Sequence, residues 1–198
     1  MWSHGEEVFA ETMFDMIRAD IRRKREVYFS RNSWMSRTFY IYFTPGVMAI
    51  IVYRFGRWIY LMRIPVIKQL LMLLYLPMKA FIIVCFGINL PVRGEIGKGF
   101  VIHNFCGIFM PRSKIGENVT VHQGVTLGSI AGKWKQPIVG NNVSFGAGAK
   151  VMGEVTIGNN VVIGANSLVI NDVPDNAVVV GVPARIVSRD SKSVYQQL

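Results

Sequence analysis

The chain has 198 residues, enough for one domain with an appendage, and its formal net charge of +10 at pH 7 predicts an anionic partner. Nucleic acid is disfavoured as that partner, because no binding motif accompanies the charge and the nearby aromatic residues follow helical spacing. The two cysteines lie in different segments, so no disulfide is predicted and a reduced, cytoplasmic setting is expected. The acidic, polar N-terminus argues against a signal peptide.

The first part of the chain, residues 1–87, is predicted to be helical, basic and apolar. An apolar stripe at helical spacing predicts a helix over residues 5–29, with a cluster of basic residues near its end. This cluster is interpreted either as a solvated helix end or as a contact with an anionic membrane surface. Residues 38–90 are apolar and interrupted by prolines, around Pro77 among other places, which predicts two or three further helices, at about 47–62 and 66–86.

The apolar helices at 47–86 allow three interpretations. They could pack in an oligomer core or against the second half of the chain, lie in a membrane surface, or span the bilayer. A span needs about 20 uninterrupted apolar residues, and here basic residues and a proline interrupt the run. Aromatic residues beside basic ones, such as Trp58 and Arg57, suit a helix that lies in the membrane surface. The expected location is therefore cytoplasmic and peripheral, at the inner face of the membrane.

From residue 88 the pattern changes, and a small aliphatic residue returns every six positions. Such a hexad is the signature of a β-solenoid, in which three short strands form one triangular coil of about eighteen residues. We predict this solenoid over residues 88–187, followed by a polar tail at 188–198, with Gly, Asn and Asp at the corners. The anchor residues are Ile96, Ile102, Ile108, Ile115, Val121, Leu127, Val139, Phe145, Val151, Ile157, Ile163 and Val169.

Two histidines share one position of the hexad. His103 follows the anchor Ile102 and His122 follows Val121, so their imidazoles are predicted to stack on adjacent coils, about 5 Å apart at their backbones. A neutral imidazole is the usual general base for a hydroxyl nucleophile. The alternative is a stacked polar pair without a catalytic role, or one histidine that orients the other. No Cys or His cluster has metal-ligand spacing, so no metal is predicted.

Residues 128–138 interrupt the hexads with a basic, aromatic loop that contains Trp134 and Lys135. A loop that projects from a rigid solenoid is a place to expect function.

The hexads, together with the segments VTVHQGVTLG, FGAGAKVMGEVTIG, IGANS and GVPARIV, resemble the hexapeptide-repeat acyltransferases. The resemblance is greatest to the serine O-acetyltransferase-like branch, which includes sugar O-acetyltransferases of polysaccharide synthesis, and it extends upstream through MIRADI and TPGVMAIIVYRFGRWIY. It implies a left-handed parallel β-helix, a homotrimer with active sites between subunits, acetyl-CoA as donor and a hydroxyl acceptor. It also makes the loop 128–138 a wall of the cleft.

The resemblance transfers to individual residues unevenly. The Asp-His pair of serine acetyltransferases falls on His103 and Asn104, so the histidine here is one position early. His103 is the predicted base, with His122 or Asn104 orienting it. The resemblance implies Ala147, Ala165 and Arg185 as coenzyme A contacts, and Trp134, Lys135 and Gln136 as acceptor contacts.

The family's second histidine falls on Gln136 and its neighbouring Arg on Lys135. This difference favours a sugar hydroxyl over serine. The sequence therefore predicts an acetyl-CoA-dependent O-acetyltransferase acting on a sugar of a cell-surface or exopolysaccharide precursor. The alternatives are a serine O-acetyltransferase of cysteine biosynthesis and a non-catalytic, membrane-associated solenoid scaffold.

Overall fold

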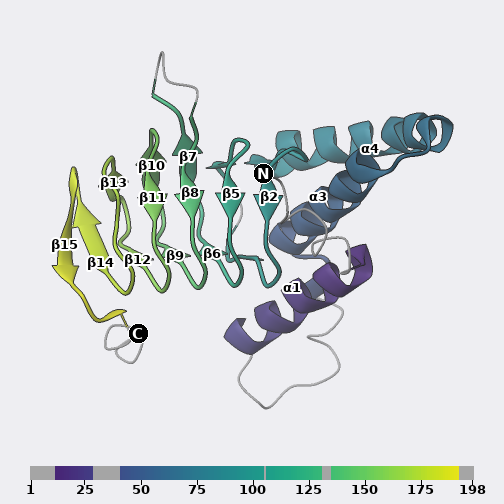
Figure 1. Ribbon diagram of the computed structural model, residues 1–198. Helices are drawn as coiled ribbons and strands as arrows, with labels where there is room; N and C mark the ends of the chain where they lie inside the picture. The colour runs from purple at the N-terminus through teal and green to yellow at the C-terminus, as the bar shows by residue number, and fades with distance from the viewer. Residues whose placement is uncertain (1–11, 29–40, 105, 131–134, 192–198) are drawn as a thin grey trace.

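The computed structural model describes residues 12–28, 41–104, 106–130 and 135–191. Helices come first: α1 (Met13–Tyr28), α3 (Pro45–Leu61) and α4 (Pro65–Phe86). They lie together at one end of a stack of short strands, and the strands nearest the C-terminus form the other end (Figure 1). The helices end at Phe86 and the first strand begins at Ile88, so the change in sequence pattern coincides with the change in structure.

The strands form three sheets that run along the stack, with one strand per sheet in each coil. The first sheet contains β1 (Ile88–Asn89), β4 (Ile108–Phe109), β7 (Thr126–Gly128), β10 (Lys150–Met152) and β13 (Leu168–Val169). The second contains β2 (Glu95–Ile96), β5 (Lys114–Ile115), β8 (Ile138–Val139) and β11 (Thr156–Ile157). The third contains β3 (Val101–Ile102), β6 (Thr120–Val121), β9 (Ser144–Phe145), β12 (Val162–Ile163), β14 (Val178–Gly181) and β15 (Ala184–Ser188).

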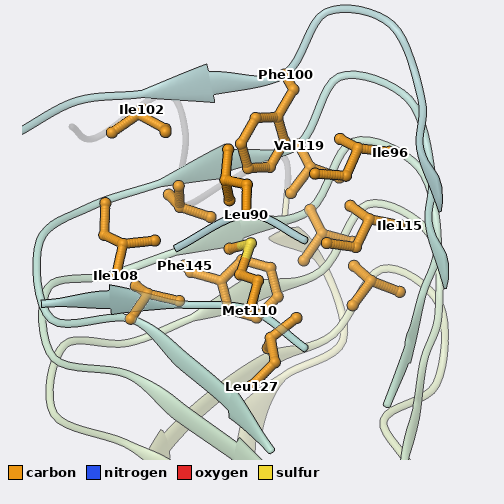
Figure 2. Packing of buried hydrophobic residues seen from close by; sticks show 14 of the residues in the cluster. Leu90, Ile96, Phe100, Ile102, Ile108, Met110, Ile115, Val119, Leu127 and Phe145 are labelled. Atoms are coloured by element: carbon orange, nitrogen blue, oxygen red, sulfur yellow. The ribbon is translucent and has the colours of Figure 1, made fainter. Parts of the chain in front are cut away.

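The hexad anchors form the core of this solenoid. Neighbouring strands pair in parallel with anchor opposite anchor, as Ile102 with Val121 and Phe145 with Ile163, and each anchor is 7% exposed or less. Figure 2 shows anchors of several coils, among them Ile102, Ile115 and Phe145, pointing into a common interior. The loop 128–138 does not disturb the alignment, because Leu127 still pairs with Val151 of the next coil. The predicted fold, a left-handed parallel β-helix behind a helical N-terminal part, is confirmed.

The corners between the second and third sheets are turned by asparagines. Asn118, Asn142, Asn160 and Asn176 all have φ between 55° and 61°, a left-handed conformation that asparagine tolerates better than other residues with a side chain. Their amides form a ladder, in which each Nδ2 donates to the Oδ1 of the next coil at 3.0–3.2 Å. The predicted preference for Gly and Asn at the corners follows from this geometry.

The helices match the predicted ranges at 47–62 and 66–86, with one difference. The predicted break around Pro77 is absent, because α4 continues through this residue to Phe86. The N-terminal helix is described from Met13, so the predicted start at residue 5 and its last residue, 29, lie outside the described residues. The chain after Val169 closes the solenoid with an antiparallel pair, β14 and β15.

The open edge of the first coil is covered by side chains of α1 and α3. The Arg23 guanidinium donates to the carbonyls of Gly99, at 2.6 Å, and Val119, at 3.2 Å. Asp20 and Arg54 form a buried ion pair, with 2.9 Å between Asp20 Oδ2 and Arg54 Nε. An uncovered strand edge exposes unpaired polar groups, and these charged side chains satisfy them.

This arrangement corrects the interpretation of the basic cluster near the end of α1. Neither a solvated helix end nor a membrane contact describes Arg23 and Lys24, whose cations bind backbone carbonyls of the solenoid. Arg22 and Arg25 of the same helix are exposed.

Candidate active site

The candidate site is built on one corner of the solenoid, where the third sheet ends and the chain turns toward the first. The residues that directly follow the anchors of β3, β6, β9 and β12 lie one above another there. Each N–H donates to the anchor carbonyl of the next coil at 2.8–3.3 Å. These residues are His103, His122, Gly146 and Gly164, and we call them the corner column.

The two histidines of the corner column stack as predicted. Their ring centroids are 4.4 Å apart and the ring planes differ by 16°. The His122 Nδ1 donates to the Phe145 carbonyl at 2.8 Å. Because a carbonyl only accepts, Nδ1 carries the hydrogen of the neutral ring and Nε2 keeps the lone pair. The corner therefore fixes both the orientation and the tautomer of His122.

The surroundings keep His103 uncharged. The pKa of His103 is lowered to about 4, mainly by burial and in addition by the His122 ring and the cations of Lys24 and Arg23. Two stacked imidazoles cannot both carry a charge at low cost. A histidine in this environment is neutral near neutral pH and is therefore able to accept a proton.

Lys24 connects α1 to the histidine pair. Its ammonium donates to the carbonyl of Ile102 and, at 3.3 Å, to the carbonyl of His103. Burial lowers the pKa of Lys24 to about 8, so the ammonium persists near neutral pH and is lost above about pH 8. Lys24 holds the backbone that carries His103 and adds a positive charge beside the imidazole.

We expect Lys24→Met to reduce kcat of any reaction that uses His103 by about tenfold, through loss of a charge-assisted hydrogen bond that positions the histidine. The acid limb of the pH profile should also move from about pH 4 toward 6.5, because one of the cations that lower the pKa of His103 is removed. Arg25→Met is the matched control, since it removes the same charge from an exposed position of α1. An unshifted acid limb in Lys24→Met would refute this role.

Three other predicted site residues directly follow members of the corner column in the sequence. Asn104 is exposed, and its Nδ2 donates to Gln123 Oε1 of the next coil at 3.0 Å. Ala147 and Ala165 come directly after Gly146 and Gly164, and the carbonyl of Ala147 accepts from the Asn166 N–H at 2.8 Å. Ala147 is partly exposed and Ala165 is exposed.

Arg185 lies at the far end of the same column. It pairs with Val180 across β14 and β15, and Val180 follows the last anchor position of this corner. A Cβ on Gly164 would lie 2.6 Å from the Val180 side chain, which confirms that the two residues are stacked. The histidines and the predicted coenzyme A contacts thus occupy one edge of the solenoid.

The predicted acceptor contacts lie at a different corner. Lys135 and Gln136 precede β8, between the first and second sheets, and Lys135 forms an ion pair with Glu154 at that corner. Trp134 lies outside the described residues. Within one chain Lys135 and Gln136 are therefore not brought to the histidine pair.

Sequence reasoning missed three parts of the site: Lys24, Arg23 and the carbonyl of Phe145. The two cations were visible as a basic cluster, but no local pattern says that a helix near the N-terminus reaches strands about 80 residues later. The Phe145 carbonyl could have been found, because Phe145 is the anchor one coil beyond Val121.

Known proteins agree with this description. Residues 136–171 match the family described as Bacterial transferase hexapeptide, with six repeats. A solved serine acetyltransferase in complex with CoA is similar in structure, with a TM-score of 0.74 and 32% identity over 92% of this chain and 73% of that one. The fold is that of a hexapeptide-repeat transferase.

Curated relatives define the family more closely. The serine acetyltransferase of Helicobacter pylori strain J99 is 34% identical over 165 residues, which are 81% of this chain and 90% of that protein. The chain belongs to the serine acetyltransferase family. The serine acetyltransferase of Synechococcus elongatus is 35% identical over 76% of this chain, and this chain spans 60% of its length. The chain spans only 51% of the Staphylococcus xylosus enzyme.

These relatives contradict the predicted sugar acceptor. Curated and solved proteins that match the chain are named serine acetyltransferases, so the prediction of a sugar O-acetyltransferase is wrong and its alternative, a serine O-acetyltransferase, is favoured. The error came from Lys135 and Gln136. These residues lie in an excursion whose length the hexad does not fix, so their alignment with functional residues of relatives carried little information.

Proposed function

We propose that the protein is a serine O-acetyltransferase that transfers the acetyl group of acetyl-CoA to the hydroxyl of L-serine. The observation that carries the proposal is the stacked pair of His103 and His122 at one end of the corner column. This pair occurs in a chain that covers 90% of the Helicobacter pylori serine acetyltransferase.

The proposed chemistry is a direct transfer with general-base catalysis. His103 accepts the proton of the serine hydroxyl as its oxygen attacks the thioester carbon, the C–S bond breaks, and the imidazolium returns the proton to the departing thiolate. His122, held through Nδ1 by the Phe145 carbonyl, keeps the pair in one orientation. Because His103 is neutral near neutral pH, it is ready to act as the base.

The corner column supports a donor site for coenzyme A. Coils rise by about 4.8 Å each, so a pantetheine arm in extended form along Ala147 and Ala165 would bring its thioester toward the histidines. The Arg185 guanidinium, exposed at the far end, suits the negative charge of the nucleotide phosphates. In this proposal the thioester end and the nucleotide end of acetyl-CoA bind along the same edge of one chain.

A homotrimer would complete the acceptor side, and we include it in the proposal. In one chain, Lys135 and His103 stand at different corners of the triangular coil. Association of three solenoids side by side brings one corner of a subunit next to a different corner of its neighbour. The loop 128–138 of one subunit would then border the histidines of the next.

We place the enzyme in the cytoplasm, where reduced Cys85 and Cys106 are in keeping with the redox conditions.

The test supplies acetyl-CoA and L-serine to the purified protein and measures the release of free thiol. We expect saturable thiol release that requires L-serine, together with O-acetylserine as product. D-serine and L-threonine serve as matched acceptors, because they alter only the configuration or one methyl group. Thiol release no faster than hydrolysis without an acceptor would overturn the proposed activity.

A further inference from the structure

The charges of α4 lie on the opposite side of the helix from those of an ordinary surface helix. Its two lysines face the protein: Lys68 Nζ donates to the Tyr60 carbonyl at 2.7 Å, and Lys79 borders a small cavity lined by Tyr53 and Tyr75. Only Tyr75 and Ile82 of the helix are buried. A surface helix normally turns its apolar residues inward and its charges outward.

The opposite side of α4 is apolar and exposed over the length of the helix. Val84 is 82% exposed, and Leu70 and Leu73 are about 70% exposed. The helix extends from the first coil of the solenoid to the margin of the molecule (Figure 1). We call this side the outer face of α4, consisting of Val66, Ile67, Leu70, Leu73, Leu74, Leu76, Phe81 and Val84. An apolar face of this extent marks an interaction surface.

We propose that the outer face of α4 docks on an anionic lipid membrane, with the helix lying in the plane of the surface. The length and composition of α4 would also allow it to cross a bilayer. Its inner side, however, packs against α3 and the first coil through Tyr75, Ile82 and Phe86. A spanning helix would have to break these contacts, whereas a helix in the surface keeps them and covers only its outer face.

Charge distinguishes lipid from a second copy of the chain as the occupant. Arg63 and Arg93 are exposed near the start of α4, and the Arg93 guanidinium lies 6.0 Å from the centroid of the Tyr60 ring. Between residues 27 and 94 the sequence has eight basic residues and no acidic one. Of these residues, Arg63 and Arg93 are exposed beside the outer face. A symmetric contact places the same surface on both subunits, so it would bring these cations toward those of the second copy. Anionic headgroups neutralise them instead.

The aromatic residues at the tip of the α3–α4 hairpin support the same orientation. Trp58 and Tyr60 are exposed beside Arg63, and Trp and Tyr are enriched at the level of the lipid headgroups. The inference does not depend on the serine acetyltransferase activity, because no residue of the corner column takes part.

The experiment measures cosedimentation of the full chain with vesicles of phosphatidylcholine, with and without about 30% phosphatidylglycerol. We expect binding to the anionic vesicles that weakens with salt and weak binding to the neutral ones. Leu73→Glu should lower the affinity at least about tenfold, because a carboxylate enters the apolar layer. Arg63→Gln should lower it about fivefold through loss of one headgroup contact. Val187→Glu is the matched control, since Val187 is 61% exposed on the solenoid.

Three outcomes would overturn the proposal. The first is failure of the intact chain to bind anionic vesicles, and the second is equal binding by Leu73→Glu and the parent protein. The third is a lower oligomeric mass of Leu73→Glu, by light scattering, with vesicle binding unchanged, which would assign the face to contacts between copies. Thiol release by Leu73→Glu in the absence of lipid should equal that of the parent, so this experiment and the serine test fail separately.

Discussion

Replacing His103 by alanine is expected to lower kcat for acetyl transfer to L-serine by about 10²–10⁴-fold, the usual contribution of a general base. The KM for acetyl-CoA should change little, because the predicted donor contacts lie on later coils. The ring centroids of His103 and His122 are 4.4 Å apart, and the His122 ring is held by the Phe145 carbonyl. Thiol release at saturating serine and acetyl-CoA measures the effect.

Comparison of Asn104→Ala with His103→Ala tests which of the two positions carries the base. The resemblance to serine acetyltransferases puts the catalytic histidine of that family on Asn104, whose side chain is exposed and hydrogen-bonded to Gln123. We expect it to retain most of the activity. Large loss in Asn104→Ala with near-normal activity in His103→Ala would show that the site is organised around position 104. A histidine introduced by Asn104→His should not rescue His103→Ala, because one step along the chain redirects the side chain.

The pH profile gives a second measurement of the same residue. A base works in its neutral form, and the pKa of His103 is lowered to about 4, so activity should persist in acid and fall only as the pH approaches this value. Protonation of His103 also lowers the free energy of unfolding. The unfolded chain binds a proton near pH 6.5 and the folded chain near pH 4, so this residue costs stability as the pH falls between these values. His103→Gln should remove that part of the acid sensitivity of the unfolding midpoint.

The solenoid could be predicted from sequence because its core repeats. Each anchor such as Ile102 or Val121 occupies the same place in successive coils, so a period of six residues encodes contacts between coils as well as local strands. For the same reason, the stacking of His103 on His122 could be predicted. Both residues follow anchors, and the single inserted residue between Ile108 and Ile115 is taken up at a corner.

The contacts of the helical part could not be predicted in this way. Lys24, Asp20 and Arg54 bind strand edges far away in sequence, and such contacts leave no periodic trace. The basic charge near the end of α1 suggested contact with solvent or with a membrane surface. In the structure, Arg23 and Lys24 bind backbone carbonyls of the solenoid instead. The inward position of the two α4 lysines could not be predicted either. Lys68 and Lys79 interrupt the apolar run, but the sequence does not say which side of the helix packs against the protein.

The second large effect is expected at the buried pair that joins α1 and α3 to the solenoid. The side chains of Asp20 and Arg54 are 2% and 4% exposed. Asp20 also accepts from the Phe100 N–H at 2.8 Å, and Arg54 donates to the Ile96 and Gly97 carbonyls at 2.6 Å. Asp20→Ala leaves the guanidinium buried without its counter-charge. We expect it to lower the free energy of unfolding by about 3–5 kcal/mol.

Urea unfolding at fixed protein concentration measures this loss, because any oligomer makes stability depend on concentration. Asp15→Ala is the matched control. Its carboxylate is exposed on the same helix, 4.0 Å from Arg18, and accepts from the Thr12 N–H at 3.3 Å, so its loss should cost far less stability than that of Asp20. The double variant Asp20→Leu/Arg54→Met should recover much of the lost stability, since an apolar pair removes both charges. If Asp20→Ala and Asp15→Ala lowered the free energy of unfolding equally, the buried pair would not stabilise the packing of the helices on the first coil. The position of Lys24 beside His103 would then need another support.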